Sequence, residues 1–253
     1  MIGLLKRTMI LGLILSIGAA VADAQGMYWE STMTGGQTPA ATSQNFYMPR
    51  MFKVVQKGEG ENILLFRLDR EKIYLLNPAN KTYQEMTFAE VEQQMKQMSA
   101  MMDQQMAELE KQMESMSPEE RKMLEQQMGG LMKPKTSGAK PEIVKTGETK
   151  KVAGMAASKY VVRRDGKDVI AIWAAPEVKD WAGMRTDFLQ FAKRMGSLSR
   201  ITEGMSDAYN KIDGFPVLTE IGGMTNTVTK VERKSTPASA FDVPAGYKKS
   251  EQK

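Results

Sequence analysis

A methionine-rich segment, residues 87–132, lies between two runs of strand-like sequence and limits the folds open to this chain more than any other feature. Its apolar residues recur every three or four positions, which is the spacing of one face of an α-helix. Thr87 and Glu90 have the spacing of a capping box, so we expect the helix to begin there. The apolar stripe consists of Val91, Met95, Met98, Met102, Met106, Leu109, Met113 and Met116.

A second set of helix-start signals follows within the same segment. Ser117 suits an N-cap, Pro118 suits the first helical position and Glu120 completes a capping box. We therefore expect two consecutive helices with a break near Ser117–Pro118. A linker over residues 133–141, which contain Pro, Ser and Gly, should follow them.

Short strand-like runs separated by turn residues occupy the chain on both sides of residues 87–132. Phe46–Val55 is expected as one strand whose pairing is limited by Pro49. Asp165–Gly166 is a strong hairpin turn signal. Apolar residues at helical spacing predict an amphipathic helix over Lys179–Met195.

The position of the helical segment between strands predicts how the chain is organised. Strands on both sides of an insertion usually belong to one sheet, because either half alone would leave open edges. We expect an α+β fold: a curved antiparallel sheet resembling an unclosed β-barrel, with helices on one face and a long Met-rich helical insertion. The expected units are a signal peptide (1–24), a single domain (25–247) and a polar tail (248–253).

The N-terminal residues have the pattern of a secretory signal peptide. Lys6 and Arg7 precede the apolar run Met9–Val21, and Ala22–Ala24 fits a cleavage site before Gln25. An uncleaved N-terminal anchor is the alternative. We expect the mature chain to be periplasmic or secreted, and not lipidated because the chain contains no Cys.

The composition excludes several kinds of chemistry. The chain has 0 Cys and 0 His, which removes the usual zinc sites, thiol nucleophiles and imidazole-dependent triads. Its formal net charge is +5, but the lysines are scattered and no nucleic-acid-binding motif is present. The adjacent carboxylates Glu119 and Glu120 fit a helix start. We therefore expect no enzyme activity, no cofactor and no nucleic-acid partner.

Three segments resemble those of a bacterial secreted family of unknown function. Ile73–Tyr83 resembles a strand–turn–strand segment, Thr146–Gly154 followed by Lys159–Tyr160 resembles a central hairpin, and Ala240–Tyr247 resembles a closing Phe-x-x-Pro-x-Gly-Tyr segment. That family is similar to the periplasmic lipoprotein-carrier fold, in which an unclosed β-barrel covers an apolar cavity and helices act as a lid. The resemblance implies no catalytic residues.

The methionine stripe is the candidate ligand-binding surface. Methionine is unbranched and polarizable, so a surface lined by it adapts to varied apolar ligands. The expected function is a non-enzymatic binding or carrier protein for an apolar ligand, such as a lipid or a lipoprotein acyl chain, with the helices as a lid. The candidate ligand-binding residues are Met95, Met98, Met102, Met106, Leu109 and Met113.

Other interpretations of the stripe stay open. Thioether sulfurs could bind Cu(I) or Ag(I), since soft ligands select soft metals. The long helices could instead bind a protein partner or a second copy, so the oligomeric state is left open. The stripe could also have no ligand and only pack on the sheet, since a packed helix face has the same spacing of apolar residues. The mild positive charge also leaves peripheral membrane contact open.

Overall fold

The structure is a computed structural model that describes residues 26–36, 40–58, 60–114, 116–117, 141–179, 181–195 and 209–250. The predicted signal peptide, the predicted second helix and most of the predicted linker lie outside the described residues. The predicted helix break also lies outside them, since Pro118 is not described.

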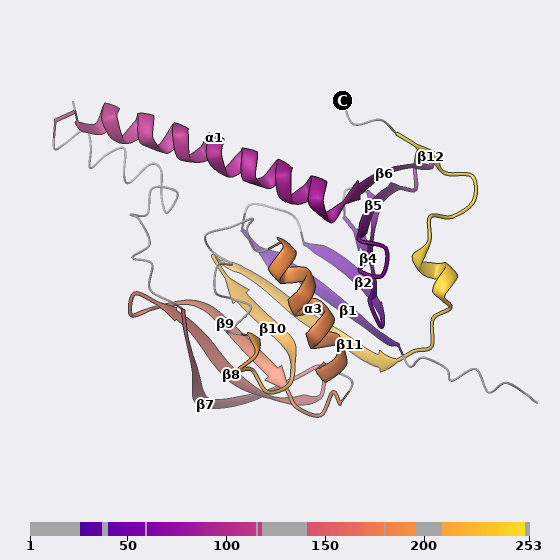
Figure 1. The fold of residues 1–253 in the computed structure, drawn as a ribbon. Coiled ribbons are helices and arrows are strands. Elements are labelled where there is room, and N and C mark those ends of the chain that lie inside the picture. The colour runs from indigo at the N-terminus through magenta and orange to yellow at the C-terminus, as the bar shows by residue number, and fades with distance from the viewer. Residues whose placement is uncertain are drawn as a thin grey trace, which may run out of the picture.

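In the described part of the chain, twelve strands form one open, curved sheet with β12 and β7 at its two edges (Figure 1). The strand order is β12-β6-β5-β4-β3-β2-β1-β11-β10-β9-β8-β7. Neighbouring strands are antiparallel except β12 and β6, which are parallel. The predicted α+β class and the predicted unclosed sheet are confirmed, and the predicted antiparallel pairing holds except between β12 and β6. The strands are β1 (Met27–Gly35), β2 (Ala41–Met48), β3 (Met51–Lys57), β4 (Glu61–Arg67), β5 (Lys72–Asn77), β6 (Thr82–Thr87), β7 (Glu142–Val152), β8 (Met155–Arg164), β9 (Lys167–Ala175), β10 (Phe215–Ile221), β11 (Met224–Arg233) and β12 (Lys248–Lys249).

The two halves of the chain join in this sheet through β1 and β11. β1 pairs with β2 on one side and with β11 on the other, so that Met27 lies opposite Arg233. A register shift between Glu30 and Ser31 interrupts the β1–β11 pairing. The strands before and after the methionine-rich helix therefore share one sheet, as the sequence predicts.

The described residues form two α-helices, α1 (Phe88–Glu114) and α3 (Trp181–Met195), and one 3-10 helix, η2 (Ala238–Phe241). In Figure 1, α3 lies across the inner face of the sheet, whereas α1 leaves the end of β6 and extends away from it. α3 confirms the helix predicted over Lys179–Met195, with its first residue at Trp181.

The main hydrophobic core lies between the sheet, α3 and the first turns of α1. Its buried side chains come from strands far apart in the sheet, such as Tyr47, Phe52 and Phe215, and from α3, such as Trp181 and Met184. Full burial of one such side chain contributes about 1.5–3 kcal/mol. α3 therefore holds together strands from both halves of the chain.

The second half of β9, from Ile172 to Ala175, is buried on both faces, which explains its apolar sequence. Successive side chains of a strand point to opposite faces. Trp173 and Ala175 belong to the main core, whereas Ile172 and Ala174 belong to a second cluster that contains Ile212. The segment before β10 thus covers the face of β9 that α3 leaves open.

A C-terminal strap, residues 234–250, covers one face at the other end of the sheet. Val243 and Tyr247 of the strap pack against a cluster that contains the buried residues Leu65 and Leu76 of β4 and β5. The strap therefore connects β11, near the middle of the sheet, with the edge formed by β6 (Figure 1).

The strap ends in two backbone hydrogen bonds to the β6 edge. The Lys248 amide donates to the Lys81 carbonyl at 2.9 Å, and the Ser250 amide donates to the Tyr83 carbonyl at 2.8 Å. The first residues of the predicted polar tail thus form the short parallel strand β12.

One strand prediction is wrong in its bounds. Phe46–Val55 is divided between β2 and β3, and Met48 pairs with Met51 across a turn formed by Pro49 and Arg50. Proline fixes its own φ near −65°, and Arg50 has a φ of 63°. The chain therefore reverses at the position where the sequence indicates only an edge or a bulge.

Candidate ligand-binding site

α1 begins where β6 ends, and the predicted capping box is formed. The Glu90 amide donates to the Thr87 hydroxyl at 3.1 Å, and the Thr87 amide donates to the Glu90 carboxylate at 2.7 Å. The hydrogen bond from the Thr87 amide lowers the pKa of Glu90. Phe88 and Val91 in the first turns are buried. The N-terminal end of α1 is therefore fixed to the core.

α3 supplies the apolar side chains that face α1 and the sheet. Trp181 and Met184 are buried, and Phe188 and Phe191 are partly buried against the same core. These residues recur at steps of three and four, as an amphipathic helix requires. The helix thus becomes less buried from its first turn toward Phe191.

Asp187 fastens α3 to the β2–β3 turn. The Tyr47 hydroxyl and the Arg50 amide both donate to the Asp187 carboxylate, at 2.9 Å and 2.6 Å. Burial and, secondly, the hydrogen bond to Asp187 raise the pKa of Tyr47. Asp187 is only 9% exposed, so these two donors compensate the cost of burying its charge.

The α1–α3 junction carries a surface of partly exposed apolar side chains. The ring of Phe191 lies 4.7 Å from that of Phe66 and 6.2 Å from that of Phe88, measured between centroids. All five members of this junction surface pack against the main core but keep part of their area accessible. The junction surface consists of Phe66, Met86, Met95, Phe188 and Phe191.

The apolar surface continues from the junction along α1. Met98 is 49% exposed and Met101 is 56% exposed, which places both among the exposed large apolar residues of the chain. Met95 lies between the buried first turns of α1, which include Val91, and the exposed middle of the helix. A ligand at the junction surface therefore has further apolar area beside it.

The structure places the six predicted site residues in different surroundings. Met95 packs against the core at the junction, Met98 is exposed, Leu109 is half-buried and Met113 is buried. The side chains of Met102 and Met106 lie outside the described part of the structure. The junction thus includes Met95 from this set, and the role of the six in ligand binding stays a prediction.

Sequence reasoning missed part of the junction surface. Phe66 and Met86 lie in β4 and β6, and nothing in their local sequence indicates that a helix packs on them. Asp187 was also missed, although a carboxylate three residues after Met184 and four before Phe191 stands out on an apolar helix face. Phe188 and Phe191 belong to the helix that the sequence predicts.

The described residues contain neither a carboxylate, His or Cys cluster for a metal ion nor a helix that could cross a membrane. Nowhere in the described ranges do three or more Asp, Glu, His or Cys side chains form a group that could hold a metal ion. Within the same part of the chain, no helix has the length and apolar content that crossing a membrane requires. The thioether-metal alternative depends on Met residues and stays open.

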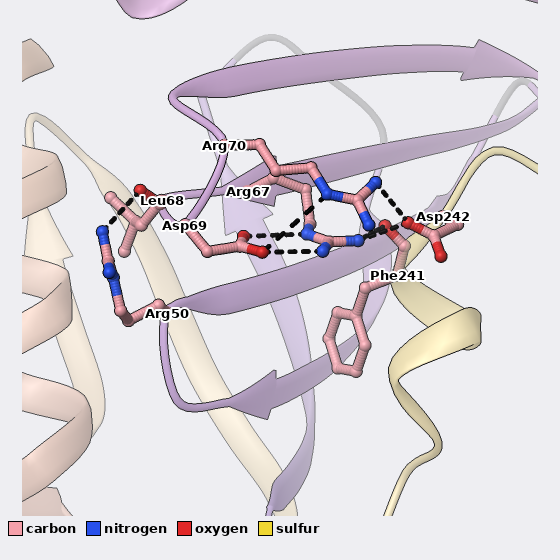
Figure 2. A network of polar contacts seen from close by, with 7 residues as sticks. All are labelled: Arg50, Arg67, Leu68, Asp69, Arg70, Phe241 and Asp242. Atoms are coloured by element: carbon pink, nitrogen blue, oxygen red, sulfur yellow. Dashed lines mark hydrogen bonds and ion pairs between the residues drawn. The ribbon is translucent and has the colours of Figure 1, made fainter.

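A second polar network surrounds the buried Arg67, but its bonds are already used within the protein (Figure 2). The Arg67 Nε and Nη2 atoms donate to the two Asp69 carboxylate oxygens at 2.9 Å and 2.7 Å. Its Nη1 donates to the Phe241 carbonyl at 3.4 Å and to the Asp242 carboxylate. The Asp69 hydrogen bonds raise the pKa of Arg67 and lower that of Asp69. We assign this network to holding the strap.

Arg70 and Arg50 extend the network at the surface. Arg70 Nη1 donates to Asp242 at 2.9 Å, and Arg50 Nη2 donates to the Leu68 carbonyl at 2.9 Å (Figure 2). The β4–β5 turn is thereby tied both to the strap and to the β2–β3 turn that anchors α3.

Comparison with known proteins places the chain in a family. Residues 89–247 match the family described as Domain of unknown function (DUF4412), and the chain belongs to that family. The expectation of a family of unknown function is thereby confirmed. The matched region begins in α1 and ends in the strap, so it includes α1, α3 and β7–β11. No curated protein matches this sequence.

Several solved structures share a distant likeness with the chain. A structure of PNGF-II in space group C2 has 11% identity and a TM-score of 0.39, and the match covers 90% of this chain and 31% of that one. The MucA/MucB complex from Pseudomonas aeruginosa has 9% identity and a TM-score of 0.40, with 89% of this chain and 57% of that one covered. The chain thus spans less than a third of the PNGF-II chain and little more than half of the MucA/MucB chain.

Proposed function

We propose that this chain is a non-enzymatic binding protein for an apolar ligand, such as a lipid or a lipoprotein acyl chain, and that the ligand binds at the junction surface. The observation that carries the proposal is the partial exposure of aromatic and methionine side chains from β4, β6, α1 and α3. Large apolar side chains at one accessible place indicate a binding surface more than a stability element. The signal pattern supports action in the periplasm or outside the cell.

The chemistry of the surface favours a flexible apolar ligand over a rigid polar one. Phe66, Phe188 and Phe191 offer ring faces and edges, and Met86 and Met95 offer unbranched side chains that adjust to irregular shapes. The accessible residues Met98 and Met101 extend the apolar area along α1. A long acyl chain would gain about 0.8 kcal/mol for each methylene that it buries there.

We further propose that α1 is the movable part of the site. Its first turns are fixed by the capping box and by the buried residues Phe88 and Val91, whereas its exposed methionines begin at Met98. The middle of α1 is exposed, so a change in its angle to α3 breaks few apolar contacts there, although Met113 near its end is buried. In this proposal α1 is a lid that closes on a ligand held against α3.

The test is the binding of an apolar fluorescent probe to the purified chain and to paired variants. Met98→Glu should weaken probe binding about tenfold or more, because a charge then borders the apolar surface. Met98→Leu should bind the probe as the unchanged chain does, since hydrophobicity and approximate volume survive. The matched control is Met33→Glu, because Met33 is similarly exposed at 43% but lies in β1.

The same variants separate the alternatives. A Cu(I) site predicts that Met98→Leu weakens copper binding as much as Met98→Glu does, because both remove the thioether. A protein-interaction module predicts a stable complex without lipid in native mass spectrometry, and the exposure of Met98 and Met101 favours this as the second candidate. Equal probe binding by Met98→Glu, Met33→Glu and the unchanged chain would contradict the proposed site.

A further inference from the structure

A surface hollow of about 390 Å³ lies on strands β8–β11, and the proposed function does not use it. Its lining includes Val161 of β8, Ala171 of β9, Glu220 of β10 and Thr225 of β11. These four residues are directly paired in register across the strands: Val161 with Ala171, Ala171 with Glu220, and Glu220 with Thr225. Directly opposite residues of antiparallel strands point to the same face, so the four form one row.

The small side chain in this row explains why the surface is hollow. Ala171 ends at its Cβ, whereas its partners Val161 and Glu220 on either side have longer side chains. The row is therefore lowest at Ala171. The hollow is of the size that small-molecule sites commonly have, about 300–1,000 Å³.

Glu220 provides the uncompensated charge of the hollow. Lys159 at one side is neutralised by Glu148, with Nζ 2.9 Å from one carboxylate oxygen. Asp168 at the other side is neutralised by Arg163, with Nε 2.9 Å from its oxygen. Across the described residues, Glu220 has neither an ion pair nor a side-chain hydrogen bond, and it is exposed. The hollow therefore presents one free negative charge.

Apolar side chains lie beside this carboxylate. Val169 is 42% exposed and Met224 is 40% exposed, and both line the hollow. They are among the large apolar residues that the fold leaves in solvent. A free carboxylate next to exposed apolar side chains is complementary to a molecule with a cationic head and a short apolar tail.

We infer that this hollow binds an amphipathic cation, an amine joined to an apolar chain of several carbons. The ammonium group pairs with Glu220, and the tail lies over Ala171 against Val169. Met224, which pairs with Ile221 next to the β10–β11 turn, borders the end of the hollow. The site is separate from the junction surface, and the inference does not depend on the proposed function.

The experiment measures the binding of octylammonium to the full chain by isothermal titration calorimetry, with octanoate and octanol as ligands of equal chain length. Octylammonium should bind more tightly than octanol, and octanoate should bind most weakly. Glu220→Gln should weaken octylammonium about twofold to fivefold, the effect of a solvent-exposed ion pair, and leave octanol unchanged. Val169→Ser with Met224→Ser should weaken octylammonium and octanol alike, about fivefold or more.

Two controls keep the outcome decisive. Glu61→Gln removes an exposed carboxylate from β4, outside the hollow, and should not change octylammonium binding. Amide chemical shifts should move at Ala171, Gly222 and Gly223, which line the hollow. The inference is overturned by an absence of saturable binding or by equal affinity for octylammonium and octanoate. It is also overturned if Glu220→Gln has no more effect than Glu61→Gln, or if the shifts move at α1 and α3 instead.

Discussion

Tyr47 and Asp187 lie 140 positions apart in the sequence, and a 2.9 Å hydrogen bond from the phenol to the carboxylate joins α3 to the sheet. The Arg50 amide adds a second hydrogen bond to the same carboxylate at 2.6 Å. α3 supplies Trp181 and Met184 to the main core and two of the five residues of the junction surface, Phe188 and Phe191. This contact therefore fixes the element on which both the fold and the proposed site depend.

We predict that Asp187→Ala is more destabilising than Tyr47→Phe. The alanine variant leaves the buried Tyr47 hydroxyl and the partly buried Arg50 amide without their acceptor, which costs about 2–4 kcal/mol. Tyr47→Phe leaves Asp187 with the Arg50 amide, and should cost about 1 kcal/mol. Chemical denaturation of both variants and of the double variant gives the coupling between them. Additive losses would contradict a direct interaction.

The stability of the chain should fall above about pH 10, the pKa of tyrosine in an unfolded chain. Burial raises the pKa of Tyr47, so the folded state keeps a proton that the unfolded state releases. Stabilisation of this kind is fully present below the unfolded pKa and is lost as the pH rises. Tyr47→Phe should reduce this pH dependence, measured by denaturation between pH 8 and about 11.

The Tyr47→Phe variant should still lose part of its stability at alkaline pH. Burial, together with the hydrogen bond to Glu30, raises the pKa of Tyr28 to about 12. A variant with both tyrosines replaced by Phe should therefore show a flatter profile than either single variant. An unchanged profile in the double variant would show that neither phenol is responsible.

The features that sequence predicts well here are local ones. The capping box of Thr87 and Glu90 involves residues three apart, and the Asp165–Gly166 turn needs only its own backbone conformation, with φ of 51° and 73°. Hydrophobic spacing likewise predicts α3, because a helix face is a local pattern. The single sheet was also predicted, from the argument that neither half could close its own edges.

The features that sequence reasoning missed depend on contacts between distant segments. Val91, Met98 and Met113 share the predicted stripe, yet Val91 and Met113 are buried whereas Met98 between them is 49% exposed. Spacing identifies a helix face but not how far a neighbour covers it. The bond of Asp187 to Tyr47 and the pairing of the strap with β6 have no local signature for the same reason.

Arg67→Met should release the C-terminal strap, whereas Arg70→Met should leave it in place. Arg67 is 4% exposed and bonds Asp69 and the strap residues Phe241 and Asp242, so its loss should cost about 2–3 kcal/mol. Arg70 bonds Asp242 from a half-exposed position, and such pairs contribute about 0–1 kcal/mol. Hydrogen exchange at Lys248 and Ser250 should accelerate only in the Arg67 variant. If hydrogen exchange accelerates equally in both variants, the strap is held only through Asp242, the residue that both arginines bond.

Gly214→Ala should destabilise the chain far more than Gly166→Ala, although both glycines have positive φ. Gly214 has a φ of 112°, and a Cβ there would lie 2.5 Å from the carbonyl carbon of Ala175. Gly166, in the β8–β9 turn, has a φ of 73° and nothing within 4 Å of an added Cβ. Backbone strain alone costs about 1–2 kcal/mol for an alanine at positive φ. The clash at Gly214 adds to this cost, since backbone cannot move aside as a flexible side chain can.

The two alanine variants also test how the end of β9 is held. The close approach of Gly214 to Ala175 lets β10 begin directly beside the last residue of β9, where Phe215 pairs with Ala175. Gly214→Ala should therefore expose Phe215 and Trp181, whose rings lie 5.5 Å apart, and shift the tryptophan fluorescence toward longer wavelength. Denaturation midpoints that fall equally in the two variants would mean that φ strain, and not the contact with Ala175, makes glycine necessary at position 214.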